Sequence, residues 1–130
     1  MKAGENGGCM CGAVRYQLSG DADFAIICQC RQCQHISGAG HAASFRVRIK
    51  DVTLDGDIMF YETKADDGNR VKSGFCPTCG NPILKKTSAL PEHVYLHAAT
   101  LDNPALFKPE LLVYETSAQP WDYVDPSIKR

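Results

Sequence analysis

The chain has 130 residues, the size of one domain, and 44% of them are hydrophobic, which is enough for a modest core. A formal net charge of −1 speaks against the broad positive surface by which proteins track nucleic acids or anionic membranes. The longest apolar run, Phe24–Cys28, falls far short of the ~20 residues that a membrane-spanning helix needs.

Short apolar segments predict strands along the chain. Val14–Leu18 alternates apolar and polar residues, the pattern of a half-buried strand. Phe24–Cys28 is a continuous apolar run, typical of a buried strand. Val52–Leu54 and Ile58–Tyr61 flank Asp55-Gly56-Asp57 and predict a hairpin, because Asp-Gly tolerates positive φ.

The rest of the chain continues this pattern. His93, Tyr95 and His97 share one face of another expected strand, and we expect that face to be solvated. Further strands are expected at residues 44–49 and 111–114, and short helical turns after Cys30 and near residues 104–106. The fold class is therefore mostly β: small antiparallel sheets around a zinc-ribbon-like four-cysteine site, in a single domain with only short helical turns. This domain is expected to cover residues 1–130, with its core from about residue 7 to residue 121.

The N-terminal segment Met1–Gly8 lacks the apolar stretch of a secretory signal peptide. The expected location is therefore the cytoplasm, where reducing conditions keep cysteines out of disulfides. The chain has seven cysteines, an odd number that cannot pair off completely. We therefore expect the cysteines to bind metal or to react.

The spacing of the cysteines indicates metal binding. They form three groups: Cys9-Met10-Cys11, Cys28-Gln29-Cys30-Arg31-Gln32-Cys33 and Cys76-Pro77-Thr78-Cys79-Gly80. In the last group, two residues between the cysteines let a tight turn present both sulfurs to one ion, and the glycine lets the backbone turn away. This zinc knuckle supplies two of the four ligands that a tetrahedral site needs.

Two further thiolates are expected from Cys9 and Cys11, which glycines flank. Together with the two knuckle cysteines they complete a closed, structural zinc site. Cys28, Cys30 and Cys33 then form a second group, whose three thiolates leave the fourth zinc position open, as in a catalytic site. The sequence thus predicts two zinc ions per chain. The three-cysteine site is the one expected to be partly empty, because its thiols can oxidise.

Other interpretations of the three-cysteine group stay open. Cys28 follows an apolar run and is also consistent with a buried core cysteine. Cys30 and Cys33 have the spacing of a redox pair, but no βαβ pattern surrounds them. His35 is a possible fourth ligand, and a site closed in this way would exclude catalysis.

A zinc ion with three thiolates is net negative, so it suits an incoming thiol, held as thiolate, better than activated water. A fourth thiolate adds to the negative charge, which then needs compensation. Our hypothesis is that Arg31 or backbone N–H groups of the loop offset it, and that His35 or His41 handles the proton of the product alkoxide. The catalytic candidates are therefore Arg31, His35 and His41. The opposing interpretation for each is a solvated or structurally satisfied side chain.

Three spaced segments carry a family resemblance: Gly7–Tyr16, Cys28–Cys33 and Ser73–Gly80. Ser37-Gly38-Ala39 and Leu101-Asp102-Asn103-Pro104 match as well. Together they resemble the glutathione-dependent formaldehyde-activating enzyme family, in the superfamily that includes centromere protein V. The resemblance extends from about Gly7 to the tail that contains Trp121.

The resemblance implies small β-sheets wrapped around a four-cysteine zinc and a catalytic zinc on the CxCxxC segment. It implies addition of glutathione to formaldehyde, giving S-hydroxymethylglutathione, and more generally carbon–sulfur lyase activity. By motif, Cys9, Cys11, Cys76 and Cys79 would hold the structural ion, and Cys28, Cys30 and Cys33 the catalytic one. The sequence has Gln29 where the family usually has His, and Gln34-His35 where a basic residue usually follows the third cysteine.

The sequence therefore predicts a zinc-dependent carbon–sulfur lyase-type enzyme that joins or cleaves a thiol, glutathione or a related one, and a small aldehyde such as formaldehyde. The alternative is a non-enzymatic zinc module that binds a protein or nucleic acid, or a thiol or redox sensor that releases zinc on oxidation. Arg46, Arg48 and Lys50 share one face of a strand and Lys85-Lys86 follows the knuckle, but these basic patches are modest.

Overall fold

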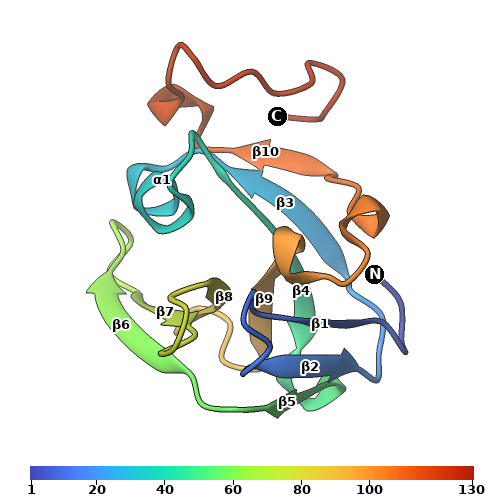
Figure 1. Ribbon diagram of the computed structural model, residues 1–130. Coiled ribbons are helices and arrows are strands. Elements are labelled where there is room, and N and C mark those ends of the chain that lie inside the picture. The colour runs from blue at the N-terminus through green and yellow to red at the C-terminus, as the bar shows by residue number, and fades with distance from the viewer.

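The computed structural model describes residues 1–130 and arranges ten strands in two sheets (Figure 1). The smaller sheet has the order β1-β2-β5, with β1 at Asn6–Gly8, β2 at Arg15–Leu18 and β5 at Val52–Asp55. The larger has the order β10-β3-β4-β9-β8-β7-β6. Its strands are β3 (Phe24–Cys28), β4 (Ala42–Arg48), β6 (Met59–Lys64), β7 (Arg70–Phe75), β8 (Pro82–Thr87), β9 (His93–His97) and β10 (Leu111–Val113). The predicted mostly β fold is confirmed.

Helical structure is confined to short pieces. The single α-helix, α1, has seven residues, Arg31–Ser37, and it follows the turn after β3. Four 3-10 turns complete the chain: η1 (Ile49–Asp51), η2 (Ala98–Thr100), η3 (Pro104–Leu106) and η4 (Glu115–Ser117). No helix has the length and apolar composition needed to cross a membrane.

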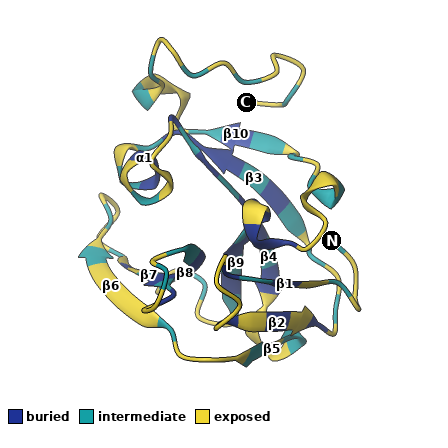
Figure 2. Ribbon diagram, viewed as in Figure 1, coloured by how far each residue is buried: buried dark blue, intermediate teal, exposed yellow.

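The main hydrophobic core joins the two sheets. Phe45 on β4 and Leu96 on β9 are opposite one another in register, and both are completely buried. Tyr16 and Leu18 on β2 belong to the same cluster from the smaller sheet. Alternating residues of β2, β4 and β9 point into this core. Figure 2 shows the buried positions concentrated in the central strands, whereas the edge strand β6 is mostly exposed.

The hairpin predicted around Gly56 is wrong. β5 pairs with β2, whereas β6 pairs with β7 in the other sheet. Gly56 does turn the chain, with φ of 102°, but a Cβ at this position would lie 2.2 Å from the carbonyl oxygen of Ala13. Val52 and Leu54 pack against the main core, and this packing holds β5 beside β2. The turn therefore carries the chain from one sheet to the other.

A second, smaller core lies at the end of β3. It consists of Cys28, Cys33 and Ala42, with Cys30 and Val113 packed against it. Ala42 is the register partner of Cys28, so the start of β4 covers the cysteine segment. This small core positions α1 at one end of the larger sheet.

Candidate metal centres

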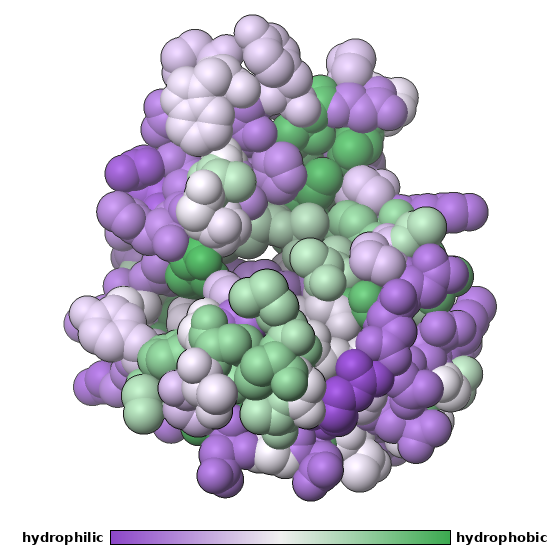
Figure 3. Space-filling model, viewed as in Figure 1, coloured by the Kyte–Doolittle hydropathy of each residue, from purple (hydrophilic) through white to green (hydrophobic).

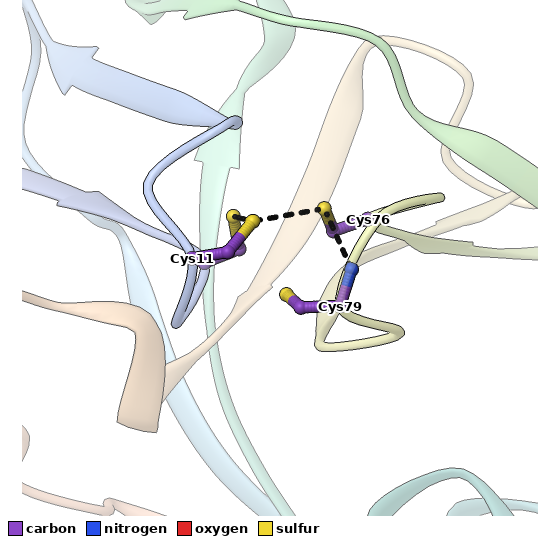
Figure 4. A group of neighbouring side chains, drawn as sticks. Cys11, Cys76 and Cys79 are labelled. Carbon is purple, nitrogen blue, oxygen red and sulfur yellow. Dashed lines mark hydrogen bonds between the residues drawn. The ribbon is translucent and has the colours of Figure 1, made fainter.

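Cys9, Cys11, Cys76 and Cys79 form a cluster in which all four sulfur atoms lie within 4.8 Å of one another. The Sγ–Sγ distance is 3.5 Å between Cys9 and Cys11, and 3.7 Å between Cys11 and Cys76. Figure 4 shows Cys11, Cys76 and Cys79 pointing toward one another from two loops that are far apart in the sequence. A tetrahedral zinc with bonds of about 2.3 Å places its sulfurs about 3.8 Å apart, so this cluster could hold a metal ion.

Both loops are tight turns that aim backbone N–H groups at sulfur. Gly12 and Gly80, with φ of 82° and 75°, adopt the left-handed conformation that lets each turn close. Cys9 Sγ accepts the N–H of Val14 at 3.2 Å. Burial raises the pKa of Cys9, but this N–H and the neighbouring thiols outweigh burial and lower the pKa to about 6. The turn therefore favours a thiolate at Cys9, whereas at Cys11 the N–H of Ala13 lowers the pKa but the neighbouring thiols and burial outweigh it and raise the pKa to about 12.

The four-cysteine cluster is also part of the main core. Cys76 is completely buried and Cys9 is 7% exposed, whereas Cys11 lies at the surface. The two loops are tied to each other by the N–H of Met10, which donates to Oδ1 of Asn81 at 2.9 Å. The sequence gives no separate signal for Asn81, because its role depends on how the two loops meet.

The second cluster contains Cys28, Cys30 and Cys33, whose sulfurs also lie within 4.8 Å of one another and could hold a metal ion. Cys28 ends β3, and Cys30 is the N-cap of α1, where its sulfur accepts the N–H of Cys33 at 3.3 Å. The neighbouring thiols of Cys28 and Cys33 lower the pKa of Cys30, whereas those of Cys28 and Cys30 raise the pKa of Cys33. Cys30 is therefore the thiol of this cluster whose environment favours the thiolate.

Lys85 brings a positive charge to this second cluster. Its Nζ lies 3.8 Å from Cys33 Sγ and 5.4 Å from the centroid of the Tyr95 ring. Burial lowers the pKa of Lys85, but the charges of the three cysteines outweigh burial and raise it, so the side chain stays an ammonium. From the sequence, charge compensation was expected from Arg31 or the backbone N–H groups of the loop, and Lys85 was grouped with a modest basic patch. The contact with Cys33 could not be predicted from the sequence, because it depends on the register of β8 in the sheet.

The three catalytic candidates lie in different surroundings. The Arg31 guanidinium donates to Oε1 of Gln34 and lies 3.4 Å from Nε2 of His35. His35 faces a cavity described below. His41 lies 2.9 Å, through Nδ1, from both carboxylate oxygens of Asp122, so it contacts the C-terminal tail.

Gln29 and Gln34, two positions at which the sequence departs from the family pattern, hold this tail in place. Gln29 Nε2 donates to Asp122 at 3.0 Å, and Gln34 Nε2 donates to the carbonyl oxygen of Ser117 at 3.0 Å. Both glutamines are buried. Burial raises the pKa of Asp122, but the hydrogen bonds from Gln29 and His41 outweigh it and lower the pKa. The tail is therefore fastened to the segment that carries the three-cysteine cluster.

A cavity of about 560 Å³ opens between α1 and strands β6 to β8. Gln32, which lies between Cys30 and Cys33, lines it and donates to Oγ1 of Thr63 at 2.6 Å. Ser73 also lines it and is the register partner of Lys85. Figure 3 shows the surface hollowed between the part of the molecule that carries α1 and the part below it.

The face of β9 that carries His93, Tyr95 and His97 is not the solvated face that we expected. All three residues are partly buried, and Nε2 of His97 is buried without a hydrogen-bond partner. Burial, with a smaller contribution from Lys85, lowers the pKa of His97 to about 4, so its ring is neutral near pH 7. The face lies beside Lys85 because Tyr95 is the register partner of that residue.

Comparisons with known proteins agree with this arrangement. Residues 5–117 match the family described as "Glutathione-dependent formaldehyde-activating enzyme". A crystal structure of a Rhodobacter sphaeroides protein is similar, with a TM-score of 0.60 and 26% sequence identity over 77% of this chain and 92% of that chain. No curated protein matches at a significant level. The family match contains all seven cysteines and Lys85, whereas Asp122 lies beyond it.

Proposed function

We propose, since the chain belongs to the glutathione-dependent formaldehyde-activating enzyme family, that it joins a thiol to a small aldehyde and cleaves the product in the reverse direction. The family supports a function related to glutathione and formaldehyde. The observation that carries the proposal is the cluster of Cys28, Cys30 and Cys33, with the Lys85 ammonium beside it and a cavity lined by the same helix.

We propose zinc as the metal of both clusters, because closely spaced thiolates suit this ion. The closed four-cysteine set would be structural. A zinc ion on the three-cysteine set would keep one position open, and there it would bind the substrate sulfur as a thiolate. The seven cysteines are all free thiols, which fits a proposed location in the reducing cytoplasm.

The reaction needs no oxidant or reductant. The thiol loses its proton, and its sulfur attacks the carbonyl carbon to form a carbon–sulfur bond. The π electrons of the carbonyl move to oxygen, and the alkoxide takes up a proton to give a hemithioacetal. In reverse, the carbon–sulfur bond breaks and the aldehyde leaves, which is the carbon–sulfur lyase direction.

The chain's own residues supply charge balance and proton transfer in this proposal. Lys85 offsets the negative charge of the thiolates, in place of Arg31, because its ammonium is the one that contacts Cys33. We assign the proton transfer to His35, since it lines the cavity and His41 is paired with Asp122. Arg31 then positions His35, whose Nε2 lies 3.4 Å from its guanidinium.

Replacing Lys85 by methionine should weaken metal binding at the three-cysteine set by about 10- to 100-fold, because an uncompensated cluster of thiolates repels itself. Competition with a chromophoric chelator measures this affinity. Lys86→Met is the matched control: Lys86 is the next residue, lies over the Phe60 ring on the other face of β8, and should leave the affinity unchanged. Equal losses in both variants would show that Lys85 has no specific role.

Exchange NMR tests the proposed reaction directly. With ¹³C-formaldehyde and either glutathione or 2-mercaptoethanol, the protein carrying two zinc ions should accelerate exchange between free aldehyde and hemithioacetal above the uncatalysed rate. Metal analysis of anaerobically purified protein gives the stoichiometry of the same sample. Two ions per chain with no acceleration for either of these thiols or for phenylmethanethiol would reject the enzyme and leave a zinc module or a redox sensor.

The nucleic-acid alternative has less support in the arrangement of charges. Arg46 is paired with Asp23 at 2.8 Å, and Lys85 is directed at Cys33. Two of the five basic residues in these patches are thus engaged within the chain, whereas Arg48 and Lys50 are exposed.

A further inference from the structure

The cavity beside α1 is unusual for a site that would bind glutathione. Its walls come from ten residues of α1, β6, β7 and the turn into β8, and none of them is Asp, Glu, Lys or Arg. Ile36, Phe75 and Pro82 supply apolar surface, and Tyr61 supplies an aromatic ring. Glutathione carries two carboxylates and an ammonium, and burying such groups without charged partners is costly.

Positive charges close to the cavity are already engaged. Lys85 lies beside Ser73 on the same face of the sheet, but its ammonium contacts Cys33 and the ring of Tyr95. Arg31 does not line the cavity, and its guanidinium is bonded to Gln34. A carboxylate in the cavity would therefore find no lysine or arginine partner among the lining residues.

The cavity and the three-cysteine cluster share the same supports. Gln32 is adjacent to Cys33 in α1 and lines the cavity, and Ser73, which also lines it, is the strand neighbour of Lys85. A molecule whose sulfur reaches the cluster could therefore extend its remaining atoms along α1 into this space. The volume of about 560 Å³ is within the usual range for small-molecule sites.

We propose that this cavity binds the part of the thiol substrate that lies away from the sulfur, and that this part is uncharged and apolar, such as an aromatic ring. The inference rests on the proposed function and names its thiol class. Ile36 and Phe75 contact the apolar group, and His35 and Ser73 provide polar contacts at its edge. Glutathione is then a poorer ligand of this chain than an aromatic thiol of suitable size.

Titration calorimetry of the zinc-loaded chain with phenylmethanethiol and with glutathione tests the proposal. We expect phenylmethanethiol to bind at least ~10-fold more tightly, and its addition to shift the backbone amide NMR signals of Gly74 and Gly80, which line the cavity. Ile36→Arg should reduce the ratio of the affinity for phenylmethanethiol to that for glutathione at least ~10-fold, because it places a guanidinium in the wall of the cavity. Ala39→Arg is the control, since Ala39 is exposed after α1, does not line the cavity, and adds the same charge.

The outcomes separate this inference from the proposed function. Tighter binding of glutathione, no binding of either thiol, or an equal effect of Ala39→Arg would overturn the cavity assignment. If glutathione binds more tightly and also reacts with formaldehyde, the proposed function stands while the cavity assignment fails. If phenylmethanethiol binds as expected but neither thiol reacts, the assignment of the cavity stands as a binding site and the proposed reaction fails.

Discussion

Cys11→Ser should lower the unfolding temperature by more than about 10 °C, although Cys11 lies at the surface. The side chain contributes little packing, and its sulfur lies beside Cys9 and Cys76. A surface substitution ordinarily changes stability little. A large fall in the unfolding temperature would therefore indicate that a metal ligand has been removed, because binding at a structural zinc site is coupled to folding.

Thermal unfolding followed by circular dichroism measures this effect. Met10→Ser is a matched control, because Met10 is the neighbouring residue, is 83% exposed and offers no thiolate, so its unfolding temperature should shift by less than about 2 °C. A strong chelator should destabilise the parent protein about as much as the substitution does. If Cys11→Ser unfolds at the parent's temperature, the four-cysteine cluster is not a structural metal site.

The cysteine groups illustrate what spacing in a sequence can predict. Two residues between Cys76 and Cys79 fix a local turn, and the sulfurs of that turn point the same way whatever the rest of the fold does. The pairing of this turn with Cys9 and Cys11 rested on counting ligands, and the structure places all four sulfurs within 4.8 Å. That these sulfurs hold zinc stays a prediction.

Sheet register explains what the sequence did not predict. Lys85 reaches Cys33 because β8 lies beside β9 and β7, and a shift of one residue would place Lys86 on that face instead. Asp122 meets His41 across 81 positions of sequence, from a tail whose last regular element is the short turn η4. Neither contact follows from local pattern, because each depends on pairings between distant segments.

The failed hairpin has the same origin. The Asp-Gly signal correctly predicts a turn at Gly56, but a turn does not determine which strands pair. Burial of Val52 and Leu54 against the main core favours pairing of β5 with β2 over pairing with β6. The strands β3 and β9, whose apolar patterns are strong, were predicted within one residue of their bounds.

Cys30→Ser should give a folded protein that has lost its activity. Cys30 is the N-cap of α1, and serine is a favourable N-cap residue, so the helix keeps its first hydrogen bond and the unfolding temperature should stay within a few degrees (~2–4 °C) of the parent's. The substitution removes one of only three thiolates in the proposed catalytic set. Metal content should fall from two ions per chain to one, and exchange of formaldehyde with hemithioacetal should slow by at least ~100-fold.

The contrast with Cys11→Ser makes this result decisive about the roles of the two clusters. Cys11→Ser should lose stability together with the ion of the four-cysteine cluster. Cys30→Ser should lose the ion of the three-cysteine cluster and the reaction, but retain the fold. A Cys30→Ser protein that unfolds as readily as Cys11→Ser would make the three-cysteine cluster structural. A variant that retains full exchange activity with one ion per chain would remove the second metal from the reaction, and the Lys85 ammonium would then be needed to stabilise the thiolates of a metal-free cluster.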